Sequence, residues 1–152
     1  MIKKIIYVLL AVLVLIQFFR PVKNIAPVAT NSNAIDQVYI LPENVKGILQ
    51  KACFDCHSNT TKYPWYANIQ PIAWWMDDHV KEGKSELNFS IFGSYTLKKQ
   101  DHKLEEISEQ IVDEMPLLSY TIAHKEAKLS KVEKEELTLW VNNLRKEIQT
   151  KM

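Results

Sequence analysis

The sequence has little glycine, little cysteine and no excess of charge of either sign. Its 152 residues include 3 glycines and 2 cysteines, and 19 basic residues face 18 acidic ones. So few glycines disfavour a turn-rich β fold, while 47% hydrophobic residues disfavour a disordered chain. Two cysteines cannot build a disulfide scaffold, and a net charge of +1 gives no general attraction for nucleic acid. We therefore expect a single small all-α domain with no nucleic-acid partner.

The amino end carries the longest apolar run of the chain. Residues 5–19 contain one polar side chain, Gln17, and follow two lysines. The run is shorter than the roughly 20 residues of a comfortable transmembrane helix, but snorkelling of the flanking basic side chains extends it. No Ala-x-Ala cleavage site follows. We expect a signal anchor with a membrane-spanning helix over residues 1–22, with a cleaved export signal as the alternative, then a linker over 23–37 and a domain over 38–149.

Both cysteines lie in one short motif. Residues 53–57 read Cys-Phe-Asp-Cys-His, which is the Cys-x-x-Cys-His pattern of covalent haem attachment. Two thiols at this spacing can each add to one vinyl group on the porphyrin edge, and the next residue places its imidazole at the iron. The motif predicts one haem c bound through Cys53 and Cys56, with His57 as the first axial ligand.

The motif has three other possible interpretations. A structural zinc site needs four ligands, and His79, His102 and His124 do not form a closely spaced pair. A thioredoxin-like redox pair follows a β strand, and no run of β-branched residues leads into Cys53. A structural disulfide would leave His57 without a role.

Apolar stripes predict three helices around the motif. The first precedes it, with apolar residues at positions 45, 48, 49 and 52 and Pro42 near its start. The second is expected to begin with Asp101 as its cap and to stop at Met115-Pro116. The third begins at a capping box of Ser130 and Glu133, and its apolar stripe runs to Ile148.

A second axial ligand must come from elsewhere in the chain. Proline restricts the preceding residue to extended backbone, so Met115 is expected to enter a loop with its thioether free of helical packing. A His/Met pair is a common arrangement in electron-carrying cytochromes. We expect Met115 as the sixth ligand, with His124 as its main rival and His79 and His102 as further candidates; a simpler role for Met115 is to fill a gap in the core.

Aromatic residues gather after the motif, and Trp65, Trp74 and Trp75 are the largest of them. Such rings can wall a flat porphyrin and exclude water from it. They are equally suited to an ordinary hydrophobic core. We treat all three as candidate pocket walls.

These segments together resemble the bacterial haem-binding domain family. The resemblance rests on residues 53–59, 63–66, 71–75 and 88–90 and on Met115-Pro116. In the order of its elements the chain also resembles the class I cytochrome c fold. The resemblance implies an exported domain with a single haem, often tethered to a membrane. The stretch from residue 63 to 97 is longer than a minimal cytochrome c needs, which leaves the local pocket and the sixth ligand open.

The expected function is therefore electron transfer on the outer, periplasmic face of the cytoplasmic membrane, with a redox protein as partner. The alternative is a haem-based sensor or small-gas-binding domain with a weak sixth ligand. An enzyme such as a peroxidase is not expected, since the sequence offers no convincing distal His/Arg pair.

Overall fold

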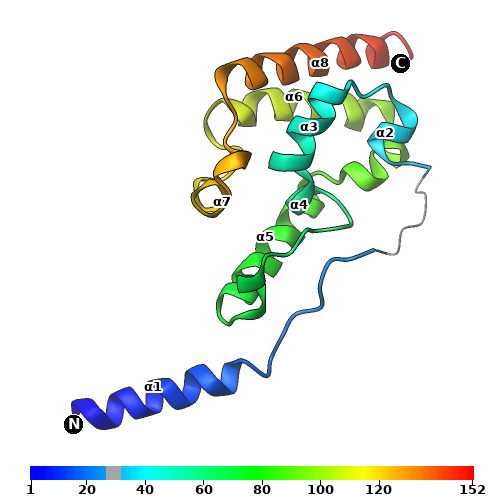
Figure 1. The fold of residues 1–152 in the computed structure, drawn as a ribbon. Helices are drawn as coiled ribbons and strands as arrows, with labels where there is room; N and C mark the ends of the chain where they lie inside the picture. Colours follow the sequence, from blue (N-terminus) through cyan, green and yellow to red (C-terminus); the bar gives the residue numbers. More distant parts are fainter. Residues whose placement is uncertain (27–31) are drawn as a thin grey trace.

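The computed structural model describes residues 1–26 and 32–152 (Figure 1). The described residues form α helices and short 3₁₀ helices (η) without a β strand, and Ile25 and Thr60 make an isolated bridge. The all-α prediction is confirmed for this part of the chain. The elements in order are α1 (Ile2–Ile16), α2 (Ile35–Val38), α3 (Glu43–Ala52), α4 (Phe54–His57), η1 (Trp65–Asn68), α5 (Ile72–Glu86), η2 (Phe89–Ser94), α6 (Leu97–Asp113), α7 (Leu118–Ala123), η3 (Lys125–Ala127) and α8 (Lys131–Gln149).

The core forms where α3, α6 and α8 meet. The helices α6 and α8 lie side by side, and α3 packs against α8 (Figure 1). Each contributes side chains with no exposed surface, among them Leu49 of α3, Leu104 of α6 and Leu137 of α8. Burying a leucine of this kind stabilises the fold by about 2 kcal/mol. The expected helix before the motif and the expected final helix are both present.

The final helix begins as its sequence predicts. The Ser130 hydroxyl accepts a hydrogen bond from the Glu133 amide, and the Glu133 carboxylate accepts one from the Ser130 amide, which completes the capping box. A cap of this type stabilises a helix by about 1 kcal/mol. The same carboxylate lies 2.5 Å from the Lys51 ammonium, so the start of α8 is also paired with the end of α3.

The helix before Met115 begins earlier than expected. Its cap is Thr96, whose hydroxyl accepts a hydrogen bond from the Lys99 amide, and the prediction of Asp101 as the cap is wrong. Asp101 lies inside α6 and accepts a hydrogen bond of 2.9 Å from Arg145 of α8. The local sequence pattern predicts that the Asp101 carboxylate caps a helix, but in the folded protein this carboxylate pairs with Arg145.

The amino-terminal helix α1 covers 15 residues. Among the described residues, none of the helices has both the length and the apolar character needed to cross a membrane, so the membrane-spanning helix expected over residues 1–22 is not found. The end of α1 is joined to the rest of the protein. The Gln17 side chain donates to the Gln70 carbonyl oxygen at 3.2 Å and accepts from the Gln70 amide at 2.9 Å.

The segment expected as a linker packs against the domain at both of its described ends. The Asn24 side chain donates to the Ser58 carbonyl oxygen and to the Thr61 hydroxyl, both at 2.9 Å. Ile35 is 1% exposed and belongs to the core. The packed domain thus begins before residue 38, and the part of the expected linker at 27–31 lies outside the described residues.

Candidate functional site

The motif occupies the short helix α4, which follows α3 directly. Cys53 ends α3 with non-helical backbone angles, and the His57 amide donates to the Cys53 carbonyl oxygen at 2.9 Å. The helix α5 passes close beside this turn at Gly83. A Cβ atom on Gly83 would lie 2.9 Å from the Cys56 carbonyl oxygen, so glycine permits the approach. The two cysteines are free thiols.

The His57 ring is held in one orientation by the end of α5. Its Nδ1 lies 3.0 Å from the Leu87 carbonyl oxygen, and because a carbonyl only accepts, Nδ1 carries the proton. This tautomer leaves the Nε2 lone pair available to a metal. Burial lowers the pKa of His57, although the Leu87 and Gly83 carbonyls oppose the shift, and the neutral imidazole is the form that binds a metal ion.

A cavity of about 540 Å³ opens beside His57. Cys53, His57 and Met115 all line it, although they come from the end of α3, from α4 and from the loop after α6. Part of its lining is apolar and buried, supplied by Leu87, Phe89, Ile107 and Ile111. Glutamates line it too, from α5 (Glu82, Glu86) and from α6 onward (Glu106, Glu109, Glu114). The volume and mixed lining are typical of a site for a small molecule or cofactor.

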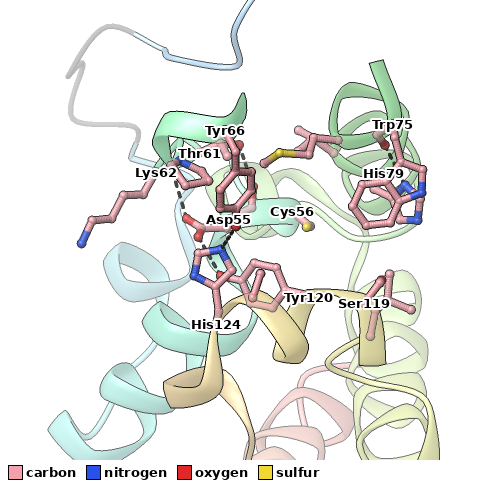
Figure 2. A pocket seen from close by; sticks show the side chains of 15 residues that line it. Asp55, Cys56, Thr61, Lys62, Tyr66, Trp75, His79, Ser119, Tyr120 and His124 are labelled. Carbon is pink, nitrogen blue, oxygen red and sulfur yellow. Dashed lines mark hydrogen bonds between the residues drawn. The ribbon is translucent and has the colours of Figure 1, made fainter. Parts of the chain in front are cut away.

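A smaller cavity of about 70 Å³ lies beside Cys56 (Figure 2). Asp55, His79, Tyr120 and His124 line it together with Cys56. The two thiols of the motif therefore border two different cavities. Burial raises the pKa of Cys53 to about 12 and that of Cys56 to about 11, so both are protonated thiols at neutral pH.

The sequence model of the family described as the haem-binding domain matches residues 11–143, which is most of the chain. The chain belongs to this haem-binding domain family. Neither the curated proteins nor the solved structures gave a match. The residues of the larger cavity fit haem, since they combine an imidazole with a free Nε2, a thioether, a thiol and apolar surface for a flat ring.

The structure separates the candidates for a sixth haem ligand into two groups. Met115 is half-buried and lines the larger cavity together with His57. His102 lines the same cavity. The His102 ring is exposed, and its Nε2 lies 3.1 Å from Glu106. His79 and His124 line the smaller cavity instead. Met115 is thus the candidate that shares a cavity with His57 and is not paired with a carboxylate.

The main rival, His124, has both ring nitrogens in use. Its Nε2 is hydrogen-bonded to the Tyr66 hydroxyl at 2.8 Å (Figure 2). Its Nδ1 lies 3.4 Å from the Glu126 carboxylate. Iron ligation by His124 would break at least one of these contacts. His79 differs from His124, because among the described residues only its Nδ1 has a hydrogen-bond partner, the Trp75 carbonyl oxygen at 2.8 Å. What sets His79 apart from Met115 is its place on the smaller cavity, which His57 does not line.

The three tryptophans expected as pocket walls do not line the cavity of His57 and Met115. Trp65 is 76% exposed, Trp74 lies partly in solvent at the start of α5, and Trp75 borders the smaller cavity. Sequence analysis missed the residues that do wall the larger cavity, Leu87 and Phe89. In the sequence, Phe89 stands out only as part of the Asn88-Phe89-Ser90 segment that carries the family resemblance.

The other interpretations of the motif receive no support. Within residues 1–26 and 32–152, no three His, Cys, Asp or Glu side chains gather in a way that suits a metal ion such as zinc. The thiols are not joined as a disulfide. The helix α3, and not a strand, leads into Cys53, which differs from the setting of a thioredoxin-like pair.

Proposed function

We propose that this haem-binding domain protein is a c-type cytochrome that carries electrons, with one haem attached covalently through Cys53 and Cys56. The observation that carries the proposal is the cavity in which Cys53, His57 and Met115 meet, with His57 oriented by the Leu87 carbonyl. On one cavity these residues supply one of the two thiols that would attach haem, together with an imidazole and a thioether that would hold its iron. The second thiol, Cys56 of α4, borders the smaller cavity and would have to turn toward the larger one to form the second bond.

Each residue has a stated task in this proposal. His57 binds iron through Nε2, and the hydrogen bond from its Nδ1 to Leu87 fixes the ring and raises its basicity. Met115 supplies a soft sulfur ligand that favours ferrous iron. Leu87 and Phe89 exclude water from one side of the site. When bound, haem supplies an iron that cycles between ferrous and ferric states.

Spectra of the purified full-length protein test the proposal. For an electron carrier we expect a low-spin, six-coordinate ferrous form that does not bind carbon monoxide, and haem that stays with the protein in acid-acetone. Ready carbon monoxide binding would instead support a sensor or gas-binding domain with a weak sixth ligand. Haem that passes into the solvent while both thiols are intact would rule out covalent attachment.

We also propose that the haem domain works outside the cytoplasm, because covalent attachment to haem takes place there and the apolar amino end is suited to export. Residues 1–22 are then an export signal that, if retained, holds the domain at the membrane. An alkaline phosphatase fused after Met152 would be active. An inactive fusion, with an active cytoplasmic reporter at the same position, would reverse this assignment.

A redox protein is the expected partner of such a carrier. No enzymatic activity is part of the proposal, since the residues around the larger cavity are assigned to holding and shielding haem. Reduction and reoxidation of the haem by small electron donors and acceptors, without turnover of peroxide, would support this assignment.

A further inference from the structure

The helix α7 follows the Met115-Pro116 step but packs only weakly on the domain. It has six residues, and none of them is buried. Its apolar side chains Leu118 and Ile122 are 76% and 69% exposed. A helix that buries so little apolar surface gains little free energy from packing. Its position therefore depends on specific polar contacts.

The most direct of these contacts reaches the haem motif itself. The Tyr120 hydroxyl donates to the Asp55 carboxylate at 2.8 Å, and Asp55 lies between the two cysteines (Figure 2). Asp55 is fixed in turn, since its other carboxylate oxygen accepts from the Lys62 amide at 3.0 Å and its carbonyl accepts from the Thr61 hydroxyl at 2.6 Å. Burial and the neighbouring Asp55 raise the pKa of Tyr120, so the phenol keeps its proton and remains a donor.

A second contact strengthens the first. The ring of Tyr120 stacks on His124, with ring centres 4.5 Å apart and planes inclined by 24°. His124 in turn is hydrogen-bonded to the Tyr66 hydroxyl of η1 at 2.8 Å. On the other side of the loop, the Met115 amide donates to the Gln110 carbonyl oxygen of α6 at 2.8 Å. Met115 is thus hydrogen-bonded to α6 through its own amide. It is followed by α7, which is hydrogen-bonded to the motif through Tyr120 and Asp55.

We propose that Tyr120 is a positioning residue for the sixth iron ligand: its hydrogen bond to Asp55 fixes α7 against the haem motif and thereby holds the Met115 loop at the cavity. The inference rests on the proposed ligation of iron by Met115. The hydrogen bond between Tyr120 and Asp55 links the helix that follows Met115 to the residue between Cys53 and Cys56. It therefore controls how far Met115 lies from the motif. A hydrogen bond to a carboxylate suits this task because it is stronger than one between neutral groups.

Spectroscopy of full-length variants tests the proposal. In Tyr120→Phe we expect covalent haem and helical circular dichroism to be retained. The ferric sulfur-to-iron band in the near infrared should weaken and the potential should fall. The equilibrium constant for release of Met115 from the iron should rise about tenfold, the change that corresponds to loss of one hydrogen bond to a charged group, so that carbon monoxide begins to bind. Asp55→Ala should reproduce these effects. The double variant should add nothing to Asp55→Ala, because that change already removes the Tyr120 contact together with the one from the Lys62 amide.

Thr121→Val is the matched control. Among the residues that the structure describes, its hydroxyl bonds only to the Leu117 and Leu118 carbonyl oxygens. The hydrogen bond between Tyr120 and Asp55 therefore stays intact, and the near-infrared band should be unchanged. Equal losses in Tyr120→Phe and Thr121→Val would overturn the inference, since any change in α7 would then act alike. If the wild-type protein shows the near-infrared band and Tyr120→Phe leaves it unchanged, the role of Tyr120 is overturned while the Met115 assignment stands. The absence of the band from the wild-type protein would overturn it together with the Met115 assignment.

Discussion

The Nδ1 atom of His57 lies 3.0 Å from the carbonyl oxygen of Leu87, the residue that ends α5. The contact joins the haem motif to a helix that begins fifteen residues after it, at Ile72. It determines the tautomer of the ring and leaves the Nε2 lone pair available to a metal ion. The end of α5 also places Leu87 on the wall of the cavity that His57 lines, so the same residue orients the imidazole through its carbonyl and adds apolar surface beside it.

Replacing His57 tests the proximal ligand. In His57→Ala we expect the haem content of the purified protein to fall strongly, because the imidazole is the main anchor of haem before the thioether bonds form. The measurement is the ratio of haem absorbance to protein. His79→Ala, on the smaller cavity, should keep the wild-type ratio. A wild-type spectrum in His57→Ala would remove this residue from the site.

Replacing the thiols tests the attachment. In the Cys53→Ser, Cys56→Ser double variant, acid-acetone should extract any haem that is present, since axial coordination does not survive unfolding and thioether bonds do. Each single variant should keep haem through the remaining thiol, at lower yield. Mass spectrometry of the denatured chain measures the result directly. Haem still attached to the double variant would place the bond on another side chain.

Much of the fold could be predicted because its signals are local. The stripe before the motif and the capping box of Ser130 and Glu133 each lie within one or two helical turns, and both helices form as expected. The start of α6 could not be predicted in this way. Thr96 and Asp101 are both good caps, and the choice between them depends on Arg145, far along the chain.

The site, too, has features that the sequence predicts and features that it does not. The Cys-x-x-Cys-His pattern is local and was recognised, and Met115 does line the cavity of His57. The Leu87 contact uses a backbone carbonyl, which every residue has, so no sequence signal could single it out. The tryptophans were misleading because size alone does not say which side a ring faces. Trp65 extends into solvent, whereas the smaller Phe89 is buried at the cavity.

Stability should depend on pH through Glu133. Hydrogen bonds from Lys51 and Ser130 lower the pKa of Glu133 from 4.5 to about 2. A lowered pKa in the folded state means that this stabilisation is complete above about pH 4.5 and is lost as the pH falls toward 2. Glu133→Gln should cost about 1 kcal/mol or less at neutral pH, because the pair is partly exposed, and should reduce the acid sensitivity. Urea unfolding across this pH range measures both.

Glu135→Gln is the control for this prediction, since Glu135 lies on the same helix and faces only an exposed Lys131 at 3.8 Å. It should leave the pH dependence of unfolding unchanged. Identical curves for Glu133→Gln and the wild-type protein would show that the capping box and its lysine do not carry the effect.

The sixth ligand is decided by comparing Met115→Ala with variants of the histidines. A soft sulfur ligand raises the potential, so Met115→Ala should lower it, open the iron to carbon monoxide and erase the near-infrared band of the ferric protein. His102→Ala, on the same cavity, should keep the band because the thioether remains. His124→Ala, on the smaller cavity, should keep it as well, weakened at most as far as in Tyr120→Phe, because the ring that stacks on Tyr120 is lost. If His124→Ala loses the low-spin spectrum while Met115→Ala keeps it, the iron has two histidine ligands, and the contacts of His124 with Tyr66 and Glu126 must rearrange when haem binds. If His102→Ala alone changes the spectrum, the ligand comes from α6, and the loop held by Tyr120 has no part in coordination.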